Sequence, residues 1–152
     1  MHRIKFLLST FCVAAILAGC VGGETYRVAI TVLPYLKAGN GRIFAYRNHT
    51  ILSTTVRRVL FLDGKPVGDV LNGKSIYVDA KAGKHVVTYN GGRNKLNINV
   101  VAGKNLYLRF DIVRDEVAVG NTTVTETRGK TAKREIEQTN LIETMVRHPD
   151  EL

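Results

Sequence analysis

The octapeptide GDVLNGKS, residues 68–75, fits at every position the G-x-x-x-x-G-K-[ST] pattern of loops that bind nucleotide phosphates. Such a loop works only between a strand and a helix, because the helix N-terminus and the loop amides bind the phosphates together. The residues after Lys74 are SIYVDA, whose alternating β-branched and aromatic side chains favour a strand. We therefore interpret Asn72-Gly73 as a β-turn and expect no nucleotide to bind.

The histidines also fail to form a recognisable site. His49, His85 and His148 have no i, i+4 partner and no carboxylate cluster at the spacing of metal ligands. His85 directly follows an Ala-Gly-Lys turn, which is a common position for an ordinary strand residue. We expect no metal and no cofactor.

The carboxylates have simpler explanations than catalysis. Asp63 lies in an Asp-Gly turn, and Asp111 has arginine neighbours with which it is expected to form a cross-strand ion pair. No serine lies in a G-x-S-x-G elbow. We therefore expect no catalytic residue and no enzyme. The alternative, an enzyme or enzyme subunit acting on envelope polymers, requires a cleft that gathers Asp69, Asp79 or His85.

The junction LAGC carries the clearest chemistry: Leu17, Ala18, Gly19 and Cys20. The chain begins with the basic segment MHRIK, and an uncharged run leads from there to the junction. This run is shorter than the roughly 20 residues of a membrane span and has the length typical of a signal peptide. The junction resembles the bacterial lipobox, in which small residues keep the cysteine accessible for attachment of a diacylglyceryl group. We expect cleavage between Gly19 and Cys20 and lipidation of Cys20. An ordinary secretory signal is the alternative.

The expected lipid anchor places the chain in the bacterial cell envelope. Val21 follows Cys20 where aspartate would favour the inner membrane, so the outer membrane facing the periplasm is favoured. Cys12 lies in the signal peptide, and the mature chain of 133 residues is long enough to bury a core without a disulfide. An address outside the cytoplasm also argues against a nucleic acid partner.

Positive charge dominates the mature chain. Loss of Arg3 and Lys5 with the signal leaves 20 Lys+Arg against 13 Asp+Glu, a net charge of +7. Two stretches, 25–62 and 80–110, contain basic residues and no acidic ones. They suit an anionic glycan or anionic lipid partner, although basic residues also cover solvated strand faces and sheet edges. The basic residues of the two stretches are Arg27, Lys37, Arg42, Arg47, Arg57, Arg58, Lys81, Lys84, Arg93, Lys95, Lys104 and Arg109.

Alternation of apolar and polar residues predicts short strands along most of the mature chain. Asp63-Gly64 predicts a hairpin, and Pro66 places the returning strand at a sheet edge. Two further hairpins are predicted at Ala-Gly-Lys turns, one joining 75–80 to 85–90 and the other joining 95–101 to 105–113. The predicted strands are 26–32, 42–47, 54–62, 66–71, 75–80, 85–90, 95–101, 105–113 and 117–125.

Seven to nine such strands, with turns every eight to twelve residues, predict an all-β, immunoglobulin-like antiparallel β-sandwich. Past Gly129 the pattern becomes helical and predicts a helix from about Thr131 to Arg147. The expected organisation is a signal peptide over 1–19, a lipidated tether over 20–24, one sandwich domain over 25–127 and a C-terminal helical segment over 128–152.

Aromatic residues recur on the predicted strands. They could form a platform on which sugars stack, but strand aromatics more often form core or cross-strand pairs. We favour the core interpretation. These residues are Phe44, Tyr46, Tyr77, Tyr89, Tyr107 and Phe110.

Three segments, GRIFAYR, FLDGKPVGDVLNGKSIYVDAKAGKHVV and VVAGKNLYLRF, carry a family likeness over about residues 41–110. The chain resembles a family of small bacterial envelope lipoproteins known only as a domain of unknown function, with the ordered motifs G-R-I-x-x-Y-R, D-G-K-x-V-G, N-G, P-G-K-H and A-G-K-x-Y-Y. Ala82 and Leu106 depart from this pattern. The resemblance implies a β-sandwich and brings no activity and no catalytic residue.

These observations together predict a lipid-anchored cell-envelope lipoprotein that acts as a non-catalytic structural or binding module. Its expected partners are the membrane, through the lipid on Cys20, and an envelope protein or anionic polymer. Recognition of an anionic glycan or lipid through the basic stretches is the alternative role.

Overall fold

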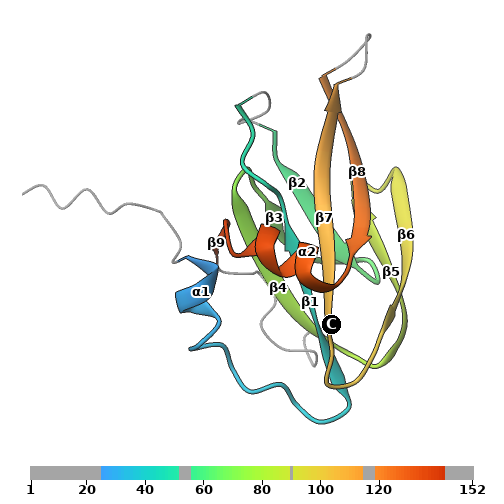
Figure 1. Cartoon of the computed structure of the whole chain (residues 1–152). Helices are drawn as coiled ribbons and strands as arrows, with labels where there is room; N and C mark the ends of the chain where they lie inside the picture. Colours follow the sequence, from blue (N-terminus) through green and yellow to red (C-terminus); the bar gives the residue numbers. More distant parts are fainter. Residues whose placement is uncertain (1–24, 52–55, 90, 115–118, 143–152) are drawn as a thin grey trace, which may run out of the picture.

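A computed structural model describes residues 25–51, 56–89, 91–114 and 119–142 of the protein, which form two β-sheets packed face to face (Figure 1). The helices are α1 (Tyr26–Ala29) and α2 (Gly129–Ile136). The strands are β1 (Asn40–Tyr46), β2 (Arg58–Leu62), β3 (Lys65–Val70), β4 (Lys74–Lys81), β5 (Gly83–Tyr89), β6 (Asn94–Val100), β7 (Asn105–Arg114), β8 (Val119–Thr127) and β9 (Asn140–Leu141).

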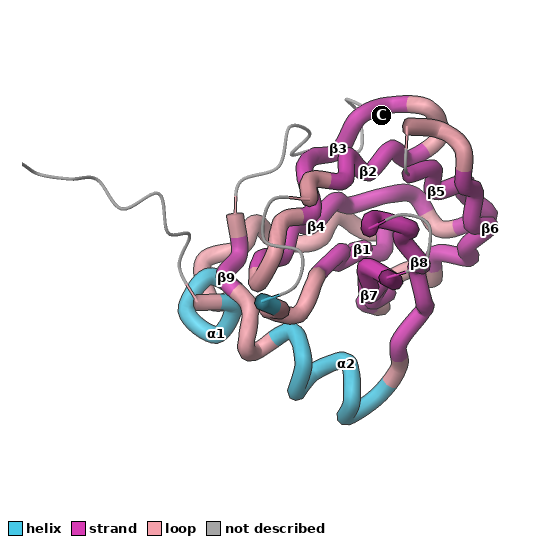
Figure 2. The backbone as a smooth tube through the Cα atoms, turned by 90° about the horizontal axis from the view of Figure 1, so that it is seen from above, coloured by secondary structure: helices cyan, strands magenta, loops and turns pink. Residues whose placement is uncertain are grey.

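The two sheets confirm the expected all-β sandwich. One sheet has five strands in the order β8-β7-β1-β4-β9, and the other has four in the order β3-β2-β5-β6. Most neighbouring strands are antiparallel, whereas β1 and β7, and also β4 and β9, are parallel. Both helices lie on the outer face of the five-stranded sheet, away from the other sheet (Figure 2).

Strand β1 is buried along its whole length because both of its faces are covered. Ile43 and Ala45 point into the core between the sheets, where they join apolar residues of β2 to β7. Phe44 and Tyr46 point to the outer face and belong to a second apolar cluster, which α1 and α2 cover. Burial on two faces explains why this strand has few polar residues.

The turn at Asp63-Gly64 forms the predicted hairpin between β2 and β3. Both residues have positive φ, 49° for Asp63 and 84° for Gly64, as a tight two-residue turn requires. Strand β3, which contains Pro66, lies at the edge of its sheet as predicted. Asn72-Gly73 is also a turn, and strand β4 follows it directly, so Lys74 starts a strand and no helix stands at this motif.

The two hairpins predicted at Ala-Gly-Lys turns are wrong. Strand β4 pairs with β1 in one sheet, whereas β5 pairs with β2 and β6 in the other. Strand β6 likewise pairs with β5, and β7 pairs with β1 and β8. Each of these turns therefore carries the chain from one sheet to the other, because β1 accepts β4 on one side and β7 on the other.

The strand predicted over 26–32 is also wrong, since α1 occupies this position. The amide of Tyr26 donates to the Thr139 carbonyl (3.0 Å), and Tyr26 and Ala29, three residues apart on the helix, face the second apolar cluster. The alternation of apolar side chains over residues 26–32 therefore does not correspond to the buried face of a strand.

The C-terminal helix is shorter than predicted. It ends at Ile136, and Asn140–Leu141 then pairs with the start of β4 as a short parallel strand. Residues 143–152 lie outside the described part of the chain. Within the described ranges, no helix has the length and apolar character needed to cross a bilayer.

Candidate functional site: a groove between β6 and β8

Three turns that each contain Ala-Gly meet at the end of the sandwich where β1 begins. They are residues 37–39, 81–83 and 101–104. The amide of Ala82 donates to the Gly39 carbonyl (2.9 Å), and the amide of Gly103 donates to the Asn40 carbonyl (2.8 Å). Backbone contacts thus fix the three turns to one another, and the lysines they carry are exposed at this end.

Gly41 allows β1 to pass this close to the turn between β6 and β7. A Cβ at Gly41 would lie 2.6 Å from both Val100 Cγ1 and the Val101 carbonyl oxygen. Such distances are shorter than van der Waals contact, so only glycine fits without movement of the turn. The position of Lys104 therefore depends on Gly41.

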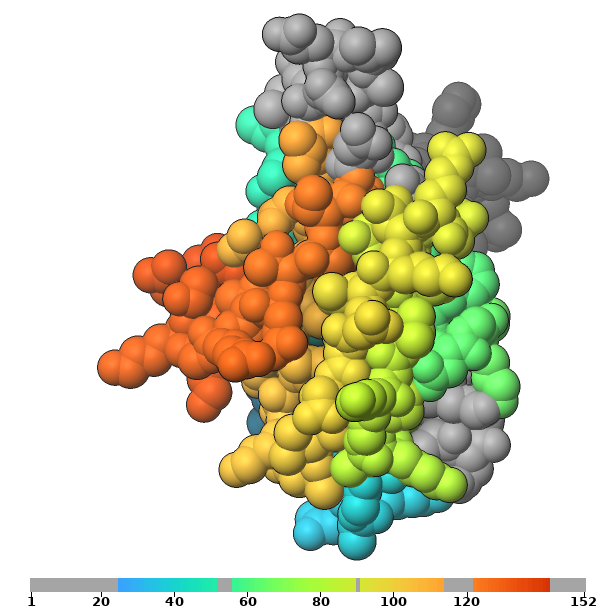
Figure 3. Space-filling model, turned by 90° about the vertical axis from the view of Figure 1, so that its right-hand side faces the viewer, coloured from blue at the N-terminus to red at the C-terminus, as the bar shows by residue number. Residues whose placement is uncertain are grey.

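A groove follows the open side of the sandwich between the edge strands β6 and β8 (Figure 3). It consists of two hollows of about 440 and about 590 Å³, which share Asn99 and Glu126 and are therefore adjacent. Each volume is within the range of about 300 to 1,000 Å³ that is usual for small-molecule sites. The groove is large enough for one or more sugar units.

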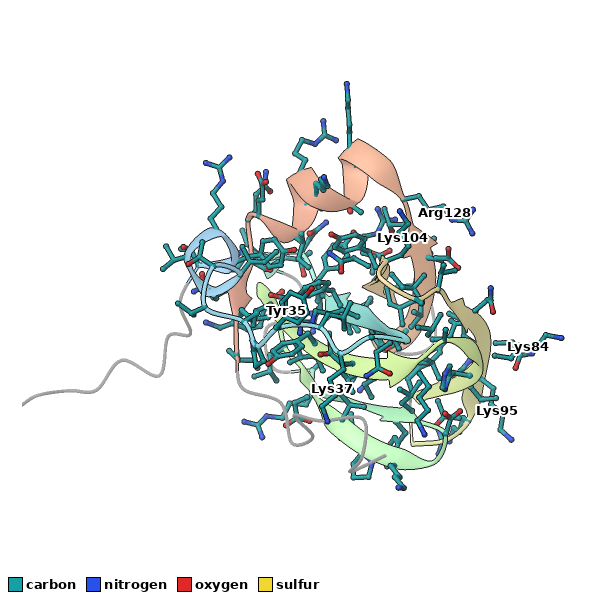
Figure 4. All side chains as sticks on the ribbon, turned by 90° about the horizontal axis from the view of Figure 1, so that it is seen from below. Tyr35, Lys37, Lys84, Lys95, Lys104 and Arg128 are labelled. Carbon is teal, nitrogen blue, oxygen red and sulfur yellow. The ribbon has the colours of Figure 1, made fainter. Side chains whose placement is uncertain are left out.

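The lining of the groove combines apolar side chains with amide and charged side chains, and most of the charged ones are cationic. Lys84, Lys104 and Arg128 contribute positive charge, and Figure 4 shows Lys104 and Arg128 near one another, with Lys84 farther away on β5. Glu126 is the acidic member of the lining, and its carboxylate accepts a hydrogen bond from Arg128 Nε (2.7 Å). Three cations against one carboxylate leave the groove positive.

Amide side chains supply the rest of the polar lining. Asn97 and Asn99 alternate on β6 with Ile98 and Val100, which point into the core, so the amides face outward. Asn105 Nδ2 donates to the Tyr107 hydroxyl (3.3 Å) at the same end of the groove. Amides both donate and accept hydrogen bonds, which suits a ligand rich in hydroxyl groups.

Asp63 and His85, which come from two different motifs, form a contact beside this groove. His85 Nδ1 lies 2.6 Å from Asp63 Oδ2, and His85 Nε2 lies 2.8 Å from the Lys81 carbonyl oxygen. Both ring nitrogens thus lie within hydrogen-bond distance of oxygen atoms. The amide of Val86 donates to the other carboxylate oxygen (2.8 Å), so Asp63 binds its turn to β5.

These contacts affect the ionisation of Asp63. Partial burial acts to raise the pKa of this carboxyl group, but the Val86 amide and the His85 ring outweigh burial and hold the pKa below its ordinary value. Asp63 therefore acts as a structural carboxylate.

The structure does not gather Asp69, Asp79 and His85 into one cleft, because each has a different partner. Asp69 lies 3.8 Å from Arg57, and His85 contacts Asp63. Asp79 accepts two hydrogen bonds from Arg42, at 2.6 and 2.7 Å, on the outer face of the five-stranded sheet. The cleft that the enzyme alternative requires is not formed by these three residues.

Asp111 has the partner that its neighbours suggested but not the expected geometry. It accepts a hydrogen bond from Arg109 (2.9 Å), which lies two residues earlier on the same strand, so the pair is not cross-strand. Arg109 also donates to Glu135 of α2 (3.2 Å), and Tyr46 donates to the same carboxylate (2.7 Å). This network fixes α2 to the outer face of the sheet.

The aromatic residues of the strands are buried and do not form an exposed platform, as the core interpretation predicted. Phe44 lies at the centre of the outer cluster, with its ring 5.5 Å from that of Tyr107 in a stacked arrangement and 5.4 Å from that of Tyr26. Tyr89 and Phe110 pack edge to face between the sheets, 5.7 Å apart.

The basic residues of the two stretches differ in exposure and position. Arg42 and Arg47 are buried, so the simpler interpretation that basic residues cover solvated faces is wrong for them. Burial lowers the pKa of Arg47, and Arg58 nearby lowers it further. Lys84 and Lys104, by contrast, are exposed and line the groove. Of the basic residues in the two stretches, only Lys84 and Lys104 line this groove.

Some predicted site residues lie outside the described part of the chain. These are Leu17, Ala18, Gly19 and Cys20 of the lipobox, for which lipidation stays a prediction. Among residues 25–51, 56–89, 91–114 and 119–142, no group of three or more His, Cys, Asp or Glu side chains could hold a metal ion.

A family model described as a protein of unknown function (DUF2846) matches residues 37–136, about two thirds of the chain. The chain belongs to the DUF2846 family. The match confirms the resemblance expected over residues 41–110 and extends it at both ends. The DUF2846 region contains β1 to β8 and α2, and therefore both sides of the groove.

A curated relative of this DUF2846 chain is a protein of Haemophilus influenzae described as an "Uncharacterized protein". It is 25% identical over 105 residues, which cover 68% of this chain and 61% of the relative. The chain thus spans less than two thirds of the length of that protein. No solved structure matches the chain.

Sequence reasoning missed Asn99, Glu126 and Arg128 as parts of one site. Glu126 and Arg128 lie outside the two basic stretches, and Asn99 lies 27 residues before Glu126 on the other sheet. A pattern along one strand cannot show which residues of another sheet lie opposite. The alternation of Asn97 and Asn99 with Leu96, Ile98 and Val100 on β6 was the signal present in the sequence.

Proposed function

We propose that this DUF2846 protein is a lipid-anchored lipoprotein of the bacterial cell envelope and a non-catalytic module that binds an anionic glycan in the groove between β6 and β8. The observation that supports binding is the set of cationic and amide side chains in the lining of that groove. The signal pattern and the LAGC junction support the anchor, and Val21 supports the outer membrane facing the periplasm.

The lining suits this class of ligand in two ways. Lys84, Lys104 and Arg128 can bind carboxylate or phosphate groups, and Asn97 and Asn99 can exchange hydrogen bonds with sugar hydroxyls. The carboxylate of Glu126 can accept further hydroxyl hydrogen bonds beside Arg128. A neutral polymer would leave the cations of the groove without a counter-charge.

Binding of a carboxylated polysaccharide, polygalacturonate, tests this proposal against neutral dextran of the same size. We expect the protein to bind polygalacturonate, with affinity that falls at least about threefold between low and physiological salt as the charges are screened. Lys104→Ala and Arg128→Ala should each weaken binding about 1.4- to fivefold, since one exposed ion contact contributes about 0.2–1 kcal/mol. Isothermal titration calorimetry measures both effects.

Lys65→Ala is the matched control, because Lys65 lies on β3 at the opposite edge of the same four-stranded sheet. It should leave the affinity unchanged. Equal binding to dextran, or equal losses in Lys65→Ala and Lys104→Ala, would contradict a specific cationic groove. Binding to anionic lipid vesicles in place of polygalacturonate would assign the groove to lipid headgroups instead.

A further inference from the structure

Exposed apolar side chains are concentrated in the segment that precedes β1. Val28 is 54% exposed, Val32 is 74% exposed and Tyr35 is 95% exposed, and Ile30 is also exposed. These four residues, which we call the apolar segment, lie within eight positions of one another. Single exposed apolar residues are common on protein surfaces, but a cluster of this kind marks a contact surface.

The structure holds the apolar segment in place at both ends. At its start, Tyr26 packs on Phe44, and its amide donates to the Thr139 carbonyl (3.0 Å). Towards its end, Arg42 donates to the Pro34 carbonyl (2.8 Å). The buried neighbours Tyr26 and Ala29 face the sheet, so the exposed side chains face outward from a fixed segment.

The short distance along the chain from Cys20 to the apolar segment indicates that the membrane lies next to this segment. Only five residue steps separate Cys20, the predicted lipidation site, from Thr25, the first described residue. An extended chain of that length spans at most about 18 Å. With acyl chains inserted in the bilayer at Cys20, α1 must lie close to the membrane surface.

The basic residues beside the apolar segment are consistent with a nearby membrane surface. Arg27 is exposed next to Val28 and forms an ion pair with Glu137 (3.2 Å), and Lys37 is exposed just after Tyr35 on the segment that leads into β1 (Figure 4). A combination of Val, Ile and Tyr side chains with flanking basic residues is typical of surfaces that lie in the headgroup region of a membrane.

We propose that the apolar segment, flanked by Arg27 and Lys37, is the surface by which the folded domain lies on the membrane, with phospholipid headgroups and upper acyl chains as its partner. This inference rests on the proposed lipid anchor at Cys20. Helix α1 contacts β9 at one edge of the five-stranded sheet, and the groove lies at the opposite edge beside β8.

Tryptophan fluorescence tests this proposal, because the chain contains no tryptophan. Val32→Trp places one reporter in the apolar segment. Val113→Trp is the matched control, since Val113 is 44% exposed and lies eight residues beyond the start of β7, about 26 Å from the end where the three turns meet. Both variants are made in the acylated full-length chain and reconstituted in phosphatidylethanolamine and phosphatidylglycerol vesicles.

Vesicle flotation reports the anchor, and quenching by brominated acyl chains reports the surface. We expect both variants to float, and Val32→Trp to shift its emission to the blue and to be quenched at least about twofold more than Val113→Trp. Flotation with equal quenching would overturn the membrane-facing surface while the anchor stands. Failure of both variants to float would overturn the anchor and this proposal together. A blue shift of Val32→Trp that grows with protein concentration without lipid would assign the segment to self-association instead.

Discussion

Arg42 and Asp79 form a charged pair that links the outer face of the sheet to the segment before β1. Their side chains are 9% and 8% exposed, and Arg42 also lies over the Tyr77 ring, 4.8 Å from its centroid. The hydrogen bonds to Asp79 raise the pKa of Arg42 despite its burial. Loss of one partner from such a pair leaves a buried charge, at a cost of about 3–5 kcal/mol. This pair therefore positions Pro34 and the exposed Tyr35 beside it.

The Asp63 carboxylate makes stability depend on pH in the acid range. Its pKa is lowered in the folded state, so its contribution is present above the unfolded value of about 3.9 and is lost as pH falls through the folded value. Asp63→Asn keeps the turn, because asparagine also accepts positive φ, and keeps an acceptor for the Val86 amide. We expect a loss of about 0.5–1 kcal/mol in unfolding free energy at pH 7, a modest value because the side chain is partly exposed.

Urea unfolding of the parent chain and of Asp63→Asn between pH 7 and pH 3 measures this effect. The difference between the two free energies should shrink as pH falls. A difference that stays constant over this range would show that the carboxylate charge does not contribute.

At the scale of elements, local patterns predicted where strands lie better than which strands pair. Alternation placed β6 and β7 correctly, because each has one face in the core between the sheets. The Ala-Gly-Lys turns have the same residues whether a strand returns in its own sheet or crosses to the other. Pairing was therefore decided by β1, which is buried on both faces and accepts β4 and β7 as neighbours.

At helix α1, the local pattern predicted the wrong kind of element. Period-two alternation over residues 26–32 predicted a strand, but the side chains that are buried are Tyr26 and Ala29, which follow helical spacing. These two side chains cover Phe44 on the outer face of the sheet. The sequence of the segment alone does not show this contact. The exposed remainder of the pattern is the apolar segment proposed to contact the membrane.

Gly41 gives a direct test of how the elements meet. Gly41→Ala would place a Cβ 2.6 Å from the Val101 carbonyl oxygen, so the turn before β7 must move. We expect a loss of about 1–3 kcal/mol, the usual cost of overpacking, measured by urea unfolding. Lys104→Ala in the same turn is the control and should change stability by less than about 0.5 kcal/mol. Equal stability of Gly41→Ala and the parent chain would contradict the close approach of β1 to this turn.

At the scale of the whole molecule, charge and apolar surface are separated. The cationic groove lies at the β8 edge of the five-stranded sheet, and the apolar segment lies near the β9 edge with the predicted anchor. A net charge of +7 on the mature chain predicted an anionic partner in general terms, but buried Arg42 and Arg47 show that the count alone does not define a surface. An anchored module that carries a cationic groove is consistent with both features.

The anchor is tested most directly by the mass of the N-terminal tryptic peptide of the protein purified from bacterial membranes. Trypsin cuts after Arg27, so the proposal predicts a peptide that begins at Cys20, ends at Arg27 and carries the added mass of a diacylglyceryl group. A peptide with unmodified Cys20, or one that continues into the residues before it, would contradict a lipid-anchored protein.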